Sequence, residues 1–152
     1  MIDIRIVDPL DPEIAAIIAF HLSGMTANSP KESVYALGAS GLSEDNVTLF
    51  GAFENETCLS IGAIKRLNAT EGEIKSMRTI KSALGRGLGK SVLQHIIEFA
   101  KQNGLESLML ETGTGESFDA AHHIYKQHGF APSPPFGDYK KSDFNRFYAL
   151  KL

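Results

Sequence analysis

The sequence predicts a single domain of the α+β, or mixed α/β, class that spans residues 1–152. The order of patterns carries this prediction: a strand opens the chain, two helices follow, three strands come in succession, and helices then alternate with strands. The length suits one hydrophobic core. Hydrophobic residues make up 43% of the chain and charged residues 22%, as is typical of globular proteins.

The N-terminal part of the chain is expected to form a strand and two helices. Residues 2–7 alternate between apolar and polar side chains, which indicates a strand. Asp11 and Pro12 are suited to the N-cap and first turn of a helix whose apolar residues recur at helical spacing. The capping box at Ser29–Glu32 predicts a second, short helix to about residue 37, and a loop is expected to follow it.

The middle of the chain is expected to be mainly strand. Apolar runs at residues 47–53 and 57–67 flank a short turn and predict an antiparallel hairpin. A third strand is expected over Glu73–Ile80, just before a glycine-rich stretch. From Gly87 to about Asn103 the apolar residues take up helical spacing.

The last third is expected to contain a strand, a helix and a final strand. Residues 107–111 predict a buried strand, and residues 145–152 predict the last strand of the chain. A helix is expected between them, with Ser117 as its N-cap and Gly129 at its end. The proline-rich loop PSPPFGD, Pro132–Asp138, is expected to be irregular.

Composition argues against several function classes. The formal net charge of −3 disfavours a nucleic-acid partner. The sequence has no run of about 20 apolar residues, so no membrane span is predicted. The N-terminus does not look like a secretory signal, so a cytoplasmic location is expected. Cys58 is the single cysteine and lies in an apolar run, which predicts a packed core thiol. The adjacent His122 and His123 point to different sides of a helix, and no metal site is expected.

The stretch LGRGLGKS, Leu84–Ser91, places glycines and basic residues where a strand ends and a helix begins. A helix N-terminus offers unsatisfied N–H donors and partial positive charge, which suit an anion. Gly87 and Gly89 let the backbone approach a phosphate, and Arg86 and Lys90 add charge. From these residues alone, an ordinary glycine turn before an amphipathic helix is the alternative.

Two common nucleotide motifs fit this stretch poorly. The Walker phosphate loop requires glycine where the chain has Leu84, and the dinucleotide fingerprint requires glycine where it has Lys90. A nucleotide-binding protein is therefore the weakest of the hypotheses that the sequence allows.

The succession of strand, glycine turn, helix, strand and a helix ending in IYKQHGF resembles the GNAT superfamily of acetyl-CoA-dependent N-acetyltransferases. The resemblance covers most of the chain. The superfamily motif Arg/Gln-x-x-Gly-x-Gly/Ala falls on Leu84–Gly89, where Gly87 and Gly89 match and leucine replaces the first residue. The segments GEIKSMRT, LETG and PPFGDY are similar to a bacterial subgroup of small YsnE-like acetyltransferases.

A second signature of the superfamily lies on the last helix. It consists of Ala121, Tyr125 and the pair Gly129-Phe130. An asparagine often precedes the tyrosine by seven residues, and this chain has Phe118 at that position.

The resemblance implies a central mixed, mostly antiparallel sheet of six to seven strands, flanked by about four helices and splayed between the fourth and fifth strands. It also implies acetyl-CoA as cosubstrate, with no metal. Met77, Arg78 and Thr79, at the end of the splayed strand, would pair with the pantetheine arm and the thioester. The remaining residues expected to bind the cosubstrate are Leu84, Gly85, Arg86, Gly87, Leu88, Gly89, Lys90 and Ser91 in the turn, with Phe118 and Ala121.

Candidate catalytic residues follow from the same resemblance. Tyr125 is the expected general acid, since a free phenol with a pKa of about 10 can protonate a departing thiolate. Glu73 is the expected general base, because some superfamily members carry a glutamate eleven residues before the motif. Glu111 ends the next strand and is the alternative base.

The expected partner is a primary amine of a small molecule or peptide. His21, Met25, Ser29 and Tyr139, together with Glu111, are the residues expected on the acceptor side. A homodimer through the late strands is a further expectation. The competing hypothesis is a non-catalytic CoA or acyl-CoA sensor or interaction module on the same fold, which the departures at Leu84 and Phe118 suggest.

Overall fold

The computed structural model describes residues 1–30 and 37–152. Seven strands form one sheet in the order β1-β2-β3-β4-β5-β7-β6. All neighbouring strands are antiparallel except the β4–β5 pair, which is parallel, so the predicted mixed, mostly antiparallel sheet is confirmed. The strands are β1 (Asp3–Ile6), β2 (Val47–Glu54), β3 (Thr57–Arg66), β4 (Glu71–Thr79), β5 (Ser107–Gly113), β6 (Ala131–Pro132) and β7 (Asn145–Lys151).

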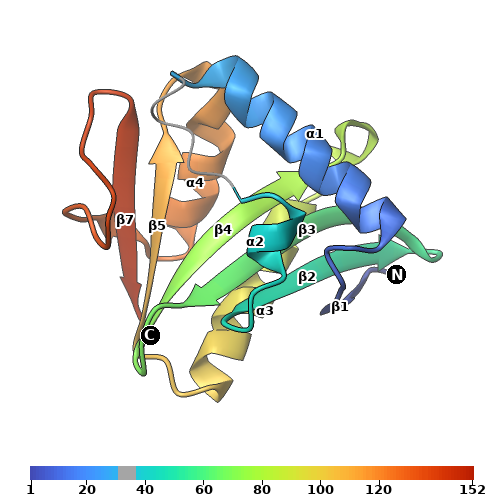
Figure 1. Ribbon diagram of the computed structural model, residues 1–152, viewed down its shortest axis with the longest axis horizontal. Helices are drawn as coiled ribbons and strands as arrows, with labels where there is room; N and C mark the ends of the chain where they lie inside the picture. The colour runs from blue at the N-terminus through green and yellow to red at the C-terminus, as the bar shows by residue number, and fades with distance from the viewer. Residues whose placement is uncertain (31–36) are drawn as a thin grey trace.

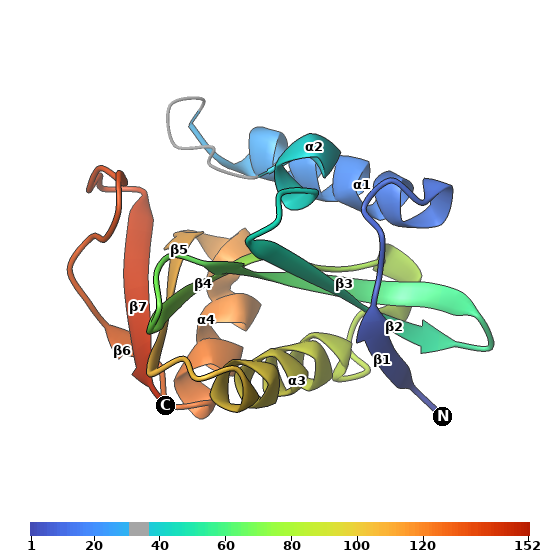
Figure 2. The same cartoon turned by 60° about the horizontal axis from the view of Figure 1, so that its bottom comes forward.

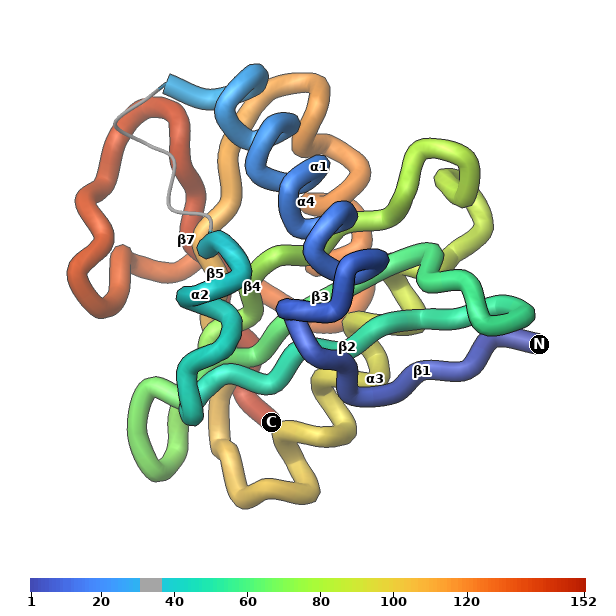
Figure 3. The backbone as a smooth tube through the Cα atoms, turned by 45° about the vertical axis from the view of Figure 1, so that its right-hand side comes forward, coloured from blue at the N-terminus to red at the C-terminus, as the bar shows by residue number. Residues whose placement is uncertain are grey.

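Helices cover both faces of the sheet. Figures 1 and 2 show α1 and α2 on one face and α3 and α4 on the other. Figure 3 shows β1 and the loop between β6 and β7 at opposite ends of the sheet. The helices are α1 (Pro12–Asn28), α2 (Ala39–Leu42), α3 (Leu88–Gln102) and α4 (Asp119–Gln127), with single 3₁₀ turns η2 (Lys81–Ala83) and η3 (Glu116–Phe118).

Each face of the sheet has its own apolar core. Ile14, Ile17 and Ile18 of α1 pack with residues of β2 and β3 on one face. Val92 and Ile96 of α3 lead a larger cluster on the opposite face. Because both faces are covered, the middle strands are buried along most of their length.

Cys58 lies in the α1-side core, as predicted. Its side chain is buried, and this burial raises the pKa of the thiol to about 11. Within the described residues, no helix is both long and apolar enough to cross a membrane.

The parallel strands β4 and β5 separate soon after they begin. Glu71–Glu73 pair with Ser107–Met109, and the register ends there. In Figure 1 the two strands start together near the C-terminus and diverge toward α1 and α4. The predicted splay between the fourth and fifth strands is therefore confirmed. Its consequence is that the β5-facing backbone edge of Met77–Thr79 has no neighbouring strand.

A β-bulge interrupts β4 just before this unpaired edge. Lys75 pairs with Ala63 and Arg78 pairs with Ile61, so two residues of β4 lie opposite one residue of β3. The bulge includes Ser76, whose φ of 57° lies in the left-handed region.

The sequence-based boundaries hold for most elements and fail at three. Asp11 accepts a hydrogen bond from the Glu13 N–H and caps α1, as predicted. Residues 39–42, expected in a loop, form α2 with Gly38 as N-cap. Ser117 is not a helix cap, because it lies inside η3 and Phe118 occupies the N-cap of α4. Pro132, the first residue of the loop expected to be irregular, forms β6 together with Ala131.

The predicted second helix, which begins at the capping box Ser29–Glu32, falls largely outside the described residues.

Candidate active site

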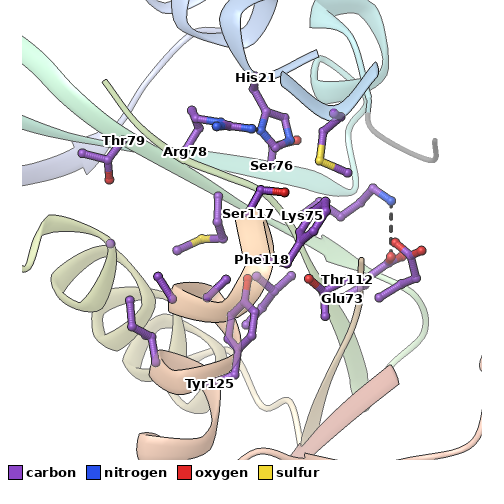
Figure 4. Close-up of a pocket in the computed structure, with 18 of the residues that line it drawn as sticks. His21, Glu73, Lys75, Ser76, Arg78, Thr79, Thr112, Ser117, Phe118 and Tyr125 are labelled. Atoms are coloured by element: carbon purple, nitrogen blue, oxygen red, sulfur yellow. Dashed lines mark hydrogen bonds and ion pairs between the residues drawn. The ribbon is translucent and has the colours of Figure 1, made fainter. Parts of the chain in front are cut away.

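A cleft opens where β4 and β5 diverge. Its volume is about 290 Å³, and its walls come from α1, β4, β5, the start of α3, α4 and the loop after β6. Figure 4 shows its side chains converging on the space between the two strands. Residues expected from the sequence that line this cleft are His21, Met25, Glu73, Met77, Arg78, Thr79, Leu84, Gly89, Glu111, Phe118, Ala121, Tyr125 and Tyr139.

Several expected residues lie beside the cleft rather than in its walls. Gly85, Arg86, Gly87, Leu88, Lys90 and Ser91 form the turn and first helical residues adjacent to Leu84 and Gly89. Ser29 lies just after α1 and is also absent from the cleft walls. The cleft walls contain polar residues that sequence reasoning missed, namely Lys75, Ser76, Thr112 and Ser117.

The turn before α3 presents a row of backbone donors. Within the described part of the chain, the amides of Gly85–Lys90 donate to no carbonyl, and the first amide bonded into the helix is that of Ser91, which donates to Gly87 O at 3.0 Å. Gly85 and Gly87 have φ values of 79° and 78°, which favour glycine, and a Cβ at either would meet no atom within 4 Å. The turn therefore combines unbonded N–H groups with the positive end of a helix dipole, which are features that suit an anion.

The side chains of this turn contribute less charge than the sequence suggests. Arg86 forms a two-point contact with Glu54, at 2.5 and 3.2 Å, at the end of β2. The Ser91 hydroxyl donates to Gly87 O at 3.1 Å. Lys90 is exposed at the start of α3. The strongest binding elements of the turn are therefore its backbone amides and Lys90.

The unpaired edge of β4 continues this row of backbone groups into the cleft. Met77, Arg78 and Thr79 line the cleft, and their strand is bonded to β3 on its other side. The Thr79 hydroxyl lies 2.9 Å from the Ser60 hydroxyl, which donates to Arg78 O at 3.2 Å. These contacts hold the end of β4 in place, so its free edge is a fixed set of main-chain donors and acceptors.

Tyr125 reaches the cleft from α4. Its side chain is 8% exposed, and Figure 4 shows its ring rising from the helix toward the space between the strands. Burial raises the pKa of its phenol to about 12, above the value assumed from the free side chain. The phenol consequently remains protonated at neutral pH and can serve as a hydrogen-bond donor.

Phe118 and Ala121 form the apolar wall next to Tyr125. Phe118 is buried and packs edge-to-face on Phe144 with ring centroids 5.6 Å apart. An added Cβ at Gly113 would lie 2.7 Å from the Phe118 ring, so the strand approaches this ring closely. This wall offers an acyl chain or thioether arm an apolar surface and no side-chain hydrogen bond.

Glu73 is buried within a small polar cluster on the α1 side of the sheet. The residue is 4% exposed. Its Oε2 accepts hydrogen bonds from Lys75 Nζ, at 3.2 Å, and from the Tyr139 hydroxyl. Lys75 Nζ also donates to the Tyr139 oxygen at 2.7 Å. The loop that follows β6 is thereby fastened to β4 through Tyr139.

Glu111 faces the same side of the sheet from β5. Burial raises the pKa of its carboxyl from 4.5 to about 7; hydrogen bonding by Asn145 and the charge of Lys75 act in the opposite direction. Glu73 adds to the rise through charge repulsion. The cleft thus holds a carboxyl group that exchanges a proton near neutral pH.

Arg78 and His21 form the polar contact at the α1 wall. Arg78 Nε donates to His21 Nδ1 at 3.0 Å, and the guanidinium lies 5.3 Å from the centre of the Phe20 ring. Burial, and secondly the charge of Arg78, lower the pKa of His21 to about 4. His21 is therefore neutral at physiological pH, and the contact leaves the positive charge of Arg78 uncompensated.

Metal ligands are not gathered in this cleft. Across the described residues, no group of three His, Cys, Asp or Glu side chains could hold a metal ion.

Comparison with known proteins connects this cleft to one family. The sequence matches the Acetyltransferase (GNAT) family over residues 14–130. It is 41% identical over 152 residues to the uncharacterized N-acetyltransferase YedL of Escherichia coli K12, covering 100% of this chain and 96% of the relative. It is 42% identical over 149 residues to the uncharacterized N-acetyltransferase YsnE of Bacillus subtilis 168, covering 98% and 99%.

A third relative and two solved structures extend the comparison. An IAA acetyltransferase of Azospirillum brasilense is 31% identical, covering 81% of this chain and 80% of its own. A structure from Klebsiella pneumoniae aligns with a TM-score of 0.82 at 23% identity, covering 100% of this chain and 98% of that one. The ribosomal-protein-S18-alanine N-acetyltransferase of Escherichia coli aligns with a TM-score of 0.72 at 18% identity, covering 99% and 94%. These two likenesses describe the fold.

Proposed function

The chain belongs to the GNAT family of acetyltransferases and is an acyltransferase, and from this premise we propose that it moves an acetyl group from acetyl-CoA to a primary amine of a small molecule or peptide. One observation carries the proposal. Among the described residues, the amides of Gly85–Lys90 are unbonded and lie beside a cleft whose walls include both the unpaired edge of Met77–Thr79 and Tyr125.

The residues present fit acetyl-CoA. Gly85 and Gly87 leave open space where a Cβ would stand, and the amides around them can hold a pyrophosphate. The free edge of β4 offers main-chain partners to the amide groups of a pantetheine arm, and Phe118 offers it an apolar wall. Acetyl-CoA supplies the activated thioester, and the residues of this chain supply position, charge stabilisation and proton transfer.

A main-chain N–H of Met77–Thr79 is the proposed donor to the thioester oxygen. The bulge at Ser76 breaks the regular pairing just before this segment, and the β5 side of the segment is unpaired. Preorganised donors of this kind contribute about 3–4 kcal/mol to acyl transfer in comparable sites.

Tyr125 is the proposed acid for the departing thiolate. Its phenol stays protonated because its pKa is raised to about 12. This pKa makes full proton transfer less favourable than from a free phenol, so Tyr125 acts first as a hydrogen-bond donor to the sulfur as negative charge develops.

Glu73 is the proposed base that accepts the proton of the amine, through a water molecule. Its Oε2 is held by Lys75 and Tyr139, which leaves Oε1 for this role. Glu111 is the second candidate, because its pKa of about 7 lies close to the operating range that a general base requires. In either case the proton leaves toward the α1 side of the sheet.

The competing function is a CoA or acyl-CoA sensor on the same fold. Phe118 gives the arm no polar side chain, and Arg86 is engaged by Glu54 rather than free for phosphate. A sensor would bind the cosubstrate and acetylate nothing. A cytoplasmic location and a homodimer through the late strands belong to the same proposal, and the molecular mass in solution tests the dimer.

The test is an amine panel with detection of released thiol, combined with direct measurement of acetyl-CoA binding. We expect Tyr125→Phe to lower kcat by about 100-fold or more while acetyl-CoA binding is kept. Tyr148→Phe is the matched control, since Tyr148 is a buried tyrosine of β7 outside the cleft walls. Acetyl-CoA binding without turnover of any amine would favour the sensor, and absence of acetyl-CoA binding would end the proposal.

The same assay separates the two candidate bases. If Glu73 is the base, Glu73→Gln lowers kcat strongly, and Glu111→Gln has a smaller effect. The reverse order assigns the role to Glu111, and a loss in neither variant excludes both.

A further inference from the structure

Arg78 is a cation of the cleft wall that has no anionic partner among the described residues. Among the residues that the structure describes, its one side-chain hydrogen bond is donated by Nε to His21, and no carboxylate of that set lies within ion-pair distance. The other arginine that sequence reasoning placed near the site, Arg86, is paired with Glu54. A partly buried charge that lacks a counter-ion is costly unless a ligand supplies one.

The neighbours of Arg78 fix the direction of its guanidinium. Phe20 lies under it at 5.3 Å, and Gly24 backs it, since a Cβ at Gly24 would lie only 2.9 Å from Nη2 and 3.4 Å from Nη1. His21 occupies Nε, which leaves the two terminal nitrogens, Nη1 and Nη2, with no protein acceptor among the described residues. Two parallel N–H donors on a planar fork match the two oxygens of a carboxylate.

A second unsatisfied group lies on the same wall. Ser76 is 9% exposed and lines the cleft, and its buried hydroxyl finds no hydrogen-bond partner in the described part of the chain. Figure 4 shows Ser76 close to His21 and Arg78 on this side of the cleft. A buried hydroxyl without a partner is uncommon and calls for an acceptor that a ligand can bring.

Another part of the cleft, near the start of β4, has the chemistry for an amine. Glu73 and Glu111 face the same side of the sheet, and Figure 4 shows the Glu73–Lys75 pair apart from His21 and Arg78, to their right in this view. A ligand that carries an amine at one end and an anion at the other would satisfy both parts at once.

From this arrangement we propose that the acceptor is an amine that also carries a carboxylate, of the amino-acid class, and that Arg78 binds this carboxylate with support from Ser76. The proposal rests on the proposed acetyltransferase function and names its substrate class. Neutral His21 orients the guanidinium without neutralising it, which makes His21 a positioning residue.

The alternative ligand for Arg78 is a phosphate of the cosubstrate. Two features favour the acceptor. Arg78 pairs with Ile61, whose side chain belongs to the α1-side core, so Arg78 projects toward α1. The amide cradle for phosphate lies instead at the start of α3, which packs on the opposite face.

The experiment compares each α-amino acid with its α-carboxamide as acceptor, under identical acetyl-CoA saturation. We expect wild-type protein to prefer the acid by at least about tenfold in kcat/KM. Arg78→Met is expected to lower kcat/KM for the acid by about 10- to 100-fold, as loss of a charge-assisted pair of hydrogen bonds predicts, so that the ratio of kcat/KM for the acid to kcat/KM for the amide falls by about tenfold or more. The KM for acetyl-CoA should not change.

Two further variants make the test independent of folding defects. Gly24→Ala places a methyl group against the Arg78 head, so it should weaken the acid acceptor without changing any charge, while alanine favours the helix. Arg5→Met is the matched control, because Arg5 also lies over a phenylalanine, at 3.9 Å from the Phe53 centroid, but on the first strand and outside the cleft. Arg5→Met should retain the full preference for acids.

The possible results separate this inference from the function on which it rests. Equal kcat/KM for acids and amides in wild-type protein, or a preference unaffected by Arg78→Met, overturns the inference and leaves the acetyltransferase standing. A rise in KM for acetyl-CoA in Arg78→Met, with the preference for acids unchanged, assigns Arg78 to the cosubstrate and also overturns it. If no amine reacts, the thermal stabilisation of the protein by N-acetylglycine is compared with that by N-acetylglycinamide, both in the presence of CoA. Greater stabilisation by N-acetylglycine supports the inference, and equal stabilisation overturns it.

Discussion

Replacing Glu111 by glutamine should make the protein more stable at alkaline pH and change its pH–rate profile. The carboxyl of Glu111 has its pKa raised from 4.5 to about 7, chiefly by burial. The folded protein therefore holds a proton at this site between about pH 4.5 and about pH 7 that the unfolded chain has released. Stability consequently falls as pH rises through this window.

The size of the effect follows from the same values. A rise of about 2.5 in pKa corresponds to about 3 kcal/mol, and partial exposure of the carboxyl reduces this to about 2 kcal/mol. Glu111→Gln removes the titrating group and keeps a similar shape. The free energy of unfolding of the variant minus that of the wild type should therefore increase by about 2 kcal/mol between about pH 5 and about pH 8.

Urea unfolding at several pH values measures this directly, and Glu44→Gln is the control because Glu44 is an exposed carboxylate outside the cleft. In the acetylation assay, wild-type kcat/KM should rise with pH through about 7 if Glu111 is the base, and the rise should disappear in the variant. A stability difference that stays constant across the pH range would refute the reasoning, because it would mean that Glu111 titrates alike in the folded and unfolded chain.

Three further predictions use single positions. Gly87→Ala and Gly104→Ala should each destabilise the protein by roughly 1 kcal/mol, because both glycines have φ of 78° and an open Cβ position, but only Gly87→Ala should also weaken acetyl-CoA binding in calorimetry. His21 has its pKa lowered from 6.5 to about 4, so wild-type stability should decline as pH falls from about 6.5 to about 4, by up to about 3 kcal/mol, and His21→Gln should flatten this decline in acid unfolding curves. Cys58, with its thiol pKa near 11, should resist Ellman's reagent at about pH 8 until urea unfolds the chain; fast reaction of the native protein would contradict its burial.

Local patterns were sufficient to predict most of the fold. The helical spacing from Gly87 to Asn103 and the alternation at residues 47–67 involve many residues, and the structure confirms a helix and a hairpin there. The short elements were missed because four residues at Ala39–Leu42 and two at Ala131–Pro132 are too few to carry a period. Such elements form because their neighbours pack on them, as Leu42 does in the α1-side core.

The site was predictable where a motif determines the backbone and less so where packing determines the side chains. The glycines of Leu84–Ser91 predict a turn, and in the structure two of them, Gly85 and Gly87, have positive φ. The pairing of Arg86 with Glu54 joins residues 32 apart in the sequence, and no local pattern reports it. The same holds for the hydrogen bond that Tyr139 donates to Glu73, because these two residues are 66 positions apart in the sequence.

The bulge at Ser76 determines which face of the sheet the end of β4 presents to α1. In an uninterrupted strand Lys75 and Arg78, three residues apart, would point to opposite faces. Both instead lie opposite odd-numbered residues of β3, Ala63 and Ile61, because the bulge inserts one residue between them. The bulge at this serine, whose left-handed conformation nothing in the sequence signals, thus places Arg78 on the α1 side, where it donates to His21. The bulge also lies directly before Met77–Thr79, the segment of β4 that lines the cleft beyond its pairing with β5, so the irregular residue lies beside both the Arg78 side chain and this backbone segment.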